Sequence, residues 1–164
     1  MASPYVIPMV DQTIIANAEL ITLRAATAWA SRASLLEILR IEVSQGGTAT
    51  SQQLGIQCGL RASTFGTYTA TTPVPTIIGT VASAIAGSTS NAASSCGTDA
   101  SALSAGALTV LFGGGFNNLN GYLWVPTPEE RVFVGMDLTF QVKLIGTPTT
   151  LTNWYAYLTF RELT

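Results

Sequence analysis

The triplet Glu129-Glu130-Arg131 holds the most reactive grouping in a chain that has few charged side chains and no histidine. Two carboxylates can cleave a glycosidic bond when they face each other about 5 to 10 Å apart. The triplet adjoins an alternating apolar segment, which predicts a strand whose adjacent side chains point to opposite faces. We therefore interpret the triplet as a polar rim, with Arg131 pairing to an acid on a neighbouring strand or subunit. A small glycan-cleaving enzyme that uses Glu129 or Glu130 stays open as an alternative.

Other catalytic groupings are missing from the sequence. Without histidine the chain lacks the usual general base at neutral pH, the commonest zinc ligand and any relay of the Ser/His/Asp kind. Its nine acidic residues are dispersed, with no Asp-x-Asp pattern, and Gly113 to Gly115 is not followed by the Lys-Ser/Thr of a phosphate loop. We predict a glycine turn there. We expect no catalytic residues, no bound cofactor and no metal, and hence a protein that is not an enzyme.

The aromatic residues near the C-terminus allow two interpretations. Trp124, Trp154, Tyr155 and Tyr157 together would make a sugar-binding platform. The interpretation we favour is a core tryptophan with exposed aromatic side chains in a subunit interface, where tyrosine and tryptophan are enriched. The candidate subunit-interface residues are therefore Glu129, Glu130, Arg131, Tyr155 and Tyr157.

Composition indicates a protein that works in an assembly. A chain of 164 residues is normally one domain. Apolar residues make up 48% of it and charged residues only 10%, against about a quarter in an average domain. No apolar run approaches the ~20 residues of a spanning helix, and the opening segment MASPYVIPMVDQT predicts no secretory signal. We therefore expect no membrane as partner. The seven basic residues are scattered and form no stripe that would attract phosphates, so we expect no nucleic acid as partner either.

The two cysteines are far apart in the sequence. Cys58 falls in a strand-like alternation and Cys96 in a Ser/Gly-rich stretch. A single disulfide between them stays possible, but with no predicted secretory signal we favour free thiols.

Period-two alternation dominates the first half of the chain. Residues 1–12 are predicted to form an extended N-terminal arm, and Thr13–Leu23 a long strand. Ala25–Ser34 fits either a helical turn or a connection of small residues. The next strand places Leu35, Leu39, Ile41 and Val43 on one face, with Glu37 out of register. This mismatch predicts either a β-bulge or a helical start.

A further strand places Leu54, Ile56, Cys58 and Leu60 on one face. The opposite face has few side chains, because two of its four positions are glycine. Bare glycines on a pleat, here Gly55 and Gly59, indicate that another backbone or subunit comes close.

Residues 62–120 form a Ser/Ala/Gly-rich excursion with Asp99 as its one charged residue. Branched apolar residues recur through it, so we expect an ordered excursion rather than disorder, with a helical turn near Ile77–Ala86. The segments ALTVLF and GYLWVP, on either side of the predicted glycine turn, are expected to be strands.

The last third carries the clearest alternation. One apolar set comprises Leu138, Phe140, Val142 and Leu144, and the other Trp154, Ala156, Leu158 and Phe160. A Gly/Pro/Thr/Asn linker joins them, which predicts an antiparallel pair. With a short strand at Arg131–Val134, the chain has about eight strands. We predict an all-β, single-domain antiparallel β-sandwich of jelly-roll type over residues 13–164.

Two segments carry a resemblance to a known family. WVPTPEERVFVGMDLTFQVKLIGTPTTLTNWYAYLTFREL resembles the closing hairpin of small tailed-bacteriophage virion proteins, especially the decoration or cement proteins of the capsid. ASRASLLEILRIEVSQGGTATSQQLGIQCGLRAS resembles their opening, in which a run of small residues leads into a strand, a Gly/Thr turn and a second strand.

The resemblance implies a jelly-roll or β-sandwich body and a structural role. Such proteins sit on the outer surface of the virion capsid, which is assembled in the host cytoplasm. They bridge neighbouring major capsid subunits, often as homotrimers. The expected partners are therefore the major capsid protein and further copies of the chain. A tail- or fibre-associated or glycan-binding β-sandwich module is the alternative.

Overall fold

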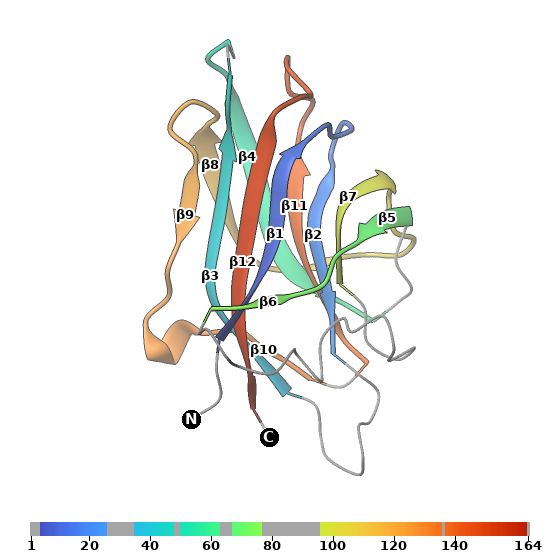
Figure 1. Cartoon of the computed structure of the whole chain (residues 1–164), viewed down its shortest axis with the longest axis vertical. Helices are drawn as coiled ribbons and strands as arrows, with labels where there is room; N and C mark the ends of the chain where they lie inside the picture. Colours follow the sequence, from blue (N-terminus) through green and yellow to red (C-terminus); the bar gives the residue numbers. More distant parts are fainter. Residues whose placement is uncertain are drawn as a thin grey trace.

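The structure of the chain is a computed structural model that describes residues 4–25, 35–47, 50–62, 67–76, 96–135 and 137–163. In these ranges it consists of two six-stranded antiparallel sheets packed as a sandwich (Figure 1). Sheet A contains β1 (Pro4–Gln12), β3 (Leu35–Gln45), β6 (Val74–Pro75), β9 (Tyr122–Trp124), β10 (Phe133–Val134) and β12 (Trp154–Leu163). Sheet B contains β2 (Glu19–Arg24), β4 (Gln53–Arg61), β5 (Thr67–Ala70), β7 (Cys96–Ala102), β8 (Thr109–Asn117) and β11 (Thr139–Ile145).

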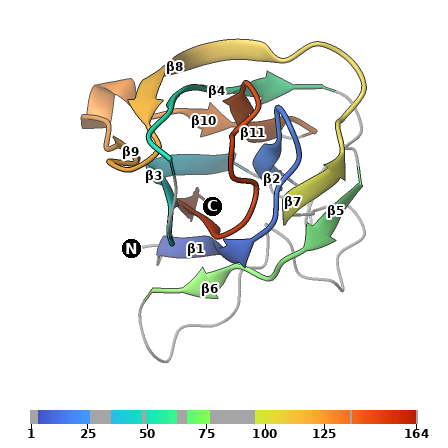
Figure 2. The ribbon, with the colours of Figure 1, turned by 90° about the horizontal axis from the view of Figure 1, so that it is seen from above.

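The strand order is that of a jelly roll. β1 pairs with β12, β2 with β11, β3 with β9 and β4 with β8. Among these eight strands, the first in the chain therefore pairs with the last, the second with the second last, and so on to the middle pair. The remaining contacts, β12 with β3 and β11 with β4, join these pairs into two sheets (Figure 2). The predicted antiparallel sandwich is confirmed. The described residues form twelve strands rather than about eight, because β5, β6, β7 and β10 extend the edges of the two sheets.

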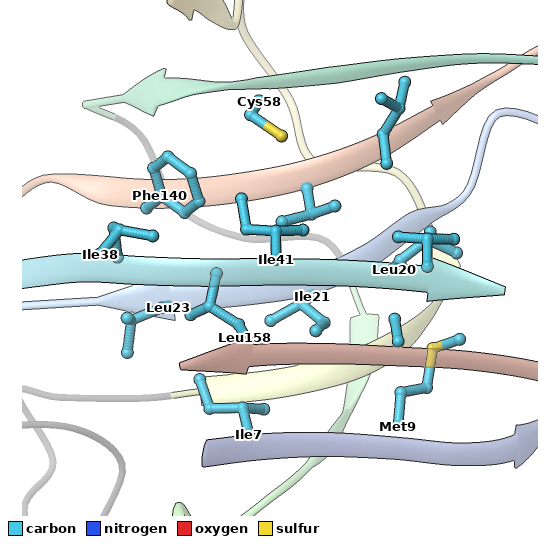
Figure 3. Packing of buried hydrophobic residues seen from close by; sticks show 14 of the residues in the cluster. Ile7, Met9, Leu20, Ile21, Leu23, Ile38, Ile41, Cys58, Phe140 and Leu158 are labelled. Carbon is cyan, nitrogen blue, oxygen red and sulfur yellow. The ribbon is translucent and has the colours of Figure 1, made fainter. Parts of the chain in front are cut away.

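The core lies between the two sheets and follows the predicted alternation. Trp154, Ala156, Leu158 and Phe160 of β12 are fully buried, and the residues between them are half-exposed. They pack across the core against Phe140, Val142 and Leu144 of β11 and the apolar side chains of β2, and beside those of β3 in their own sheet. Figure 3 shows part of this packing, with Leu158 and Phe140 labelled. Each fully buried large apolar side chain contributes about 1.5–3 kcal/mol to folding.

The prediction that the last two strands pair with each other is wrong. β11 lies between β2 and β4 in sheet B, whereas β12 lies between β1 and β3 in sheet A. The linker between them crosses from one sheet to the other, with Gly146 and Asn153 in left-handed conformations at its two ends. Alternation identifies the buried face of a strand, but the strand's neighbours depend on the path of the linker.

The predicted N-terminal arm is a strand of the sandwich. Tyr5, Ile7 and Met9 of β1 alternate into the core, and β1 lies between β12 and β6. Pro4 is tolerated as the first residue of β1, and Pro8 because β6 pairs only with Tyr5 and Val6, which leaves this edge of β1 open at Pro8.

The long strand predicted over residues 13–23 is also shorter than expected. Only β2 is extended, because Asn17 turns the chain in a left-handed conformation and its N–H donates to the carbonyl of Gly146 at 2.9 Å.

The register problem in β3 is resolved by a bulge. Ile38 pairs with Phe160 and Arg40 with Thr159, so Leu39 is the extra residue. Before the bulge Leu36 and Ile38 point into the core, and after it Ile41 and Val43 do so. The bulge alternative is confirmed, and Leu35 and Leu39 are half-exposed rather than core residues.

The glycine turn predicted at residues 113–115 is wrong, because these glycines lie inside strand β8 and pair with residues 55–57 of β4. A Cβ added at Gly113 would lie 2.3 Å from the carbonyl oxygen of Ile56, and one at Gly59 2.2 Å from that of Thr109. The predicted close approach of another backbone at Gly59 is thus confirmed, and that backbone is β8. The excursion predicted for residues 62–120 contributes β5, β6, β7 and β8, and the helical turn predicted near Ile77–Ala86 lies outside the described residues.

Candidate functional site

The outer face of sheet A, the face turned away from the core, carries two of the predicted interface residues at its centre. Tyr155 and Tyr157 lie on β12, which is flanked by β1 and β3. Tyr155 pairs with Ser44 and Tyr157 with Glu42 of β3. Both tyrosines are half-buried, so each ring presents one part to the sheet and another to solvent. Such amphipathic side chains are typical of interfaces.

The charged groups on this face are paired with one another. Arg40 pairs with Glu42, and Glu37 pairs with both Arg131 and Arg161. The Glu37 side chain is only 3% exposed, and Nη1 of Arg131 lies 3.0 Å from its Oε1. Burial acts to raise the pKa of Glu37, but hydrogen bonds and positive charge from Arg161 and Arg131 outweigh it and lower the pKa below the ordinary value of 4.5.

Exposed apolar side chains flank the tyrosines on this face. Val74 of β6, on one side, is 53% exposed and pairs with Val6. On the other side, Leu123 of β9 is 60% exposed beside Glu42, and Phe133 of β10 is 47% exposed beside Glu37. Single exposed apolar residues are ordinary. Several of them on one face, beside arginines that are ion-paired with glutamates, indicate an interaction surface.

An open hollow of about 330 Å³ lies on this face above β3 and β9. Its walls include the Tyr157 ring, Leu123 and the polar groups of Glu42, Ser44 and Asn120. The hollow is large enough to take a side chain of another molecule and offers that side chain both apolar contact and hydrogen-bond partners.

The three residues of the triplet Glu129-Glu130-Arg131 do not form one site: the two glutamates lie in a turn, and the arginine pairs elsewhere. Glu129 and Glu130 belong to the 3₁₀ turn η1 (Pro128–Glu130), so the prediction that they lie on a strand is wrong. Both are exposed, and among the described residues neither forms an ion pair. Arg131 instead reaches Glu37, which confirms the predicted pairing with an acid on a neighbouring strand.

The four aromatic residues considered as a sugar platform do not come together. Trp154 is fully buried, and its indole N–H donates to the carbonyl of Thr150 at 2.9 Å, so the core-tryptophan interpretation is confirmed for it. Trp124 lies at the edge of the sandwich and stacks on Phe112 of β8 with ring centroids 4.2 Å apart. The two rings close the gap between the sheets at that edge.

A buried polar cluster on the outer face of sheet B was missed by sequence reasoning. Arg61 Nη1 donates to the carbonyl oxygens of Ser104, Ala105 and Gly106 at 2.6–2.9 Å. Its Nε donates to Gln141, and Glu19 accepts from the backbone N–H and hydroxyl of Ser104. The cluster holds the β7–β8 connection against the sheet. Its members come from four separate segments, so no local pattern marks it.

The two cysteines are buried free thiols on different strands of sheet B. Burial raises the pKa of Cys58 and of Cys96 to about 12, so both are protonated at neutral pH. Within the described ranges no group of three or more His, Cys, Asp or Glu side chains is placed to hold a metal, and no helix is long and apolar enough to cross a membrane.

The strand order, core and surface together define a single antiparallel jelly-roll sandwich whose outer face on sheet A carries ion-paired charges, two tyrosines and exposed apolar side chains. Comparison with known proteins finds no matching family model, no similar curated protein and no similar solved structure.

Proposed function

We propose that this chain is a structural virion protein, a capsid decoration or cement protein that binds the assembled shell of a tailed bacteriophage. The observation that carries the proposal is the outer face of sheet A. There each arginine is ion-paired with a glutamate of the chain, two tyrosines lie at the centre, and apolar side chains on both flanks are exposed to solvent. A low charge content and the resemblance of two segments to decoration proteins support the same role.

The sheet A face suits contact with further copies of the chain. A homotrimer with threefold symmetry would bury this face around its axis and would match threefold positions of an icosahedral shell. Ion pairing lowers the cost of removing the face from water, since Arg40, Arg131 and Arg161 each have a carboxylate beside them. The half-buried tyrosines and the apolar flanks then supply the apolar contact area.

Stabilisation of the shell follows from linkage. A protein that binds neighbouring major capsid subunits only when they are assembled favours the assembled state by mass action. Repetition over the lattice multiplies the effect, because each bound trimer holds several subunits at once. No catalytic step and no cofactor is needed for this role.

Cryo-electron microscopy of purified particles tests the proposal. We expect density for the jelly roll on the outer surface of the shell, in contact with more than one major capsid subunit. Particles without the protein should release their genome at a lower temperature than complete particles. Finding the protein only in the tail, or absent from the particle, would refute the capsid role.

The hollow beside Tyr157 favours a second candidate function, glycan binding by a tail- or fibre-associated module. An aromatic ring next to carboxylate, hydroxyl and amide groups is a suitable environment for a sugar ring. A glycan array separates the two roles. Binding that is lost in Tyr157→Ala and retained in Lys143→Ala, on the opposite sheet, would favour the glycan role.

A further inference from the structure

Strand β8 forms a free edge of sheet B, on a different side of the molecule from the outer face of sheet A. Among the described residues it pairs with β4 alone. It runs for nine residues, and none of them is charged. An edge strand has backbone N–H and C=O groups that point away from its neighbour, and proteins usually protect such an edge with charges, proline or short length. β8 has none of these protections, although it does contain one bulge near Leu111.

The exposure of β8 leaves this edge open to another backbone. Val110, Leu111 and the three glycines that follow Phe112 are exposed, and the glycines add no side chain that would block an approach. From Thr109 to Phe116, the described hydrogen bonds of β8 are those with β4. The chemistry that satisfies unpaired backbone groups along a strand is a second extended backbone.

A hollow of about 340 Å³ adjoins this edge and indicates which side chain such a segment would carry. Its walls are Leu111, Phe112, Trp124, Val132 and Glu130. β8 and β9 lie on the same side of the sandwich in Figure 2, and η1 brings Glu130 to the hollow between them. Aromatic and aliphatic walls with a carboxylate at the rim match an arginine or lysine, whose stem is apolar and whose head is positive.

The charges of the described residues favour a partner over a second copy of this chain. Glu129 and Glu130 are exposed carboxylates without an ion pair among the described residues. The described arginines, by contrast, are all engaged with acidic side chains: Arg24 with Asp137, Arg40 with Glu42, Arg61 with Glu19, and Arg131 and Arg161 with Glu37. Lys143 belongs to β11, which is enclosed between β2 and β4 and has no free edge to offer.

We propose that the edge of β8 binds an extended peptide segment of a partner protein as an added strand, with a basic side chain of that segment in the hollow beside Glu130. Backbone hydrogen bonds along β8 provide the affinity, and the carboxylate and the Trp124 ring select the basic residue. The proposal does not depend on the capsid role, because it uses another surface.

The experiment uses three capped nine-residue peptides of alternating threonine and valine. The first peptide has arginine at its centre and the second has glutamate there. The third also has a central arginine, but the backbone amides on both sides of it are N-methylated. Binding to the full chain is followed by NMR of backbone amides and indole N–H groups. We expect the arginine peptide to shift the β8 amides and the Trp124 indole signal, with the other two peptides bound at least about fivefold more weakly. Glu130→Gln should weaken binding of the arginine peptide by about two- to fivefold, whereas the matched variant Glu42→Gln on sheet A should not.

Three results would overturn the proposal. The first is no shift of β8 signals with any peptide at millimolar concentration. The second is equal binding of the arginine and glutamate peptides, which would remove the role of Glu130. The third is protection of the outward-pointing β8 amides, those that do not donate to β4, from hydrogen exchange in the free protein together with a dimeric mass, which would show that a second copy occupies the edge.

Discussion

Arg61 Nη2 at the end of β4 lies 3.4 Å from Glu19 Oε1 at the start of β2, although β11 separates the two strands. Their side chains are only 3% and 1% exposed. The pair lies on the outer face of sheet B, and the β7–β8 connection covers it through the hydrogen bonds of Ser104. A buried pair of this kind is costly to break, because the remaining partner is left as an uncompensated buried charge.

Removing the guanidinium of Arg61 should therefore destabilise the fold strongly. We expect Arg61→Ala to lower the free energy of unfolding by about 3–5 kcal/mol in urea denaturation. Arg61→Lys should recover only part of this loss, since an ammonium group cannot serve three carbonyls and Gln141 at once. The matched control is Arg40→Ala, which breaks the exposed pair with Glu42 and should cost at most about 1 kcal/mol. Equal losses for Arg61→Ala and Arg40→Ala would contradict the structural role of the cluster.

Glu37 should make stability depend on acid pH. Its pKa is lowered in the folded state, so the carboxylate stabilises the fold fully above its ordinary, unfolded pKa of 4.5. This contribution is lost as the pH falls through the lower, folded-state pKa. Glu37→Gln should reduce stability at pH 7 and flatten the decline below pH 4.5. Thermal unfolding between pH 2 and pH 7 measures both effects, and a decline as steep as in the wild type would contradict them.

Two neighbouring glycines of β8, Gly113 and Gly114, should respond differently to alanine. A Cβ at Gly113 would meet the carbonyl oxygen of Ile56 at 2.3 Å, whereas the nearest atom to a Cβ at Gly114 is a ring carbon of Tyr122 at 3.7 Å. Gly113→Ala should destabilise by about 1–3 kcal/mol, because backbone has to move. Gly114→Ala should be neutral or slightly stabilising, since it restricts the unfolded chain. The opposite order in chemical denaturation would show that β8 does not lie against β4 in this register.

The two thiols should be inert in the native protein. Their raised pKa values, about 12 for both, leave almost no thiolate at pH 8, and both side chains are buried. A thiol reagent such as dithionitrobenzoate should therefore modify Cys58 and Cys96 only as fast as the protein opens. In denaturant two thiols per chain should react at once. Rapid reaction of either thiol in buffer would contradict the buried positions.

Much of the fold could be predicted because alternation reports burial directly. Every second residue of β12 is buried, and the inward-facing apolar residues of β4 and β11 keep the same spacing, although the outward-facing Gly59, Thr139 and Gln141 are buried as well. Pairing was harder to predict. β11 and β12 are adjacent in the sequence, yet their linker crosses between the sheets, and only the folded path of residues 146–153 decides this.

The candidate site was predictable in part. Tyr155 and Tyr157 alternate with core residues, so their outward position follows from the sequence. The partner of Arg131 does not, because Glu37 is 94 residues away and faces outward only as a result of its place before the bulge at Leu39. Glu129 and Glu130 do not lie on a strand, because Pro128 starts a 3₁₀ turn before the short strand predicted at Arg131–Val134.

The central claim, that the outer face of sheet A is a contact between copies in the capsid-bound form, is tested most directly by mass in solution. Light scattering coupled to gel filtration should give about 52 kDa for the wild type, three times the 17.2 kDa of one chain. Tyr157→Glu, which puts a second carboxylate opposite Glu42 at the centre of the face, should shift the mass towards one chain, while Lys143→Gln on sheet B should leave the trimer intact. A wild-type mass of about 17 kDa at every concentration, or a trimer that Tyr157→Glu does not weaken, would contradict the account.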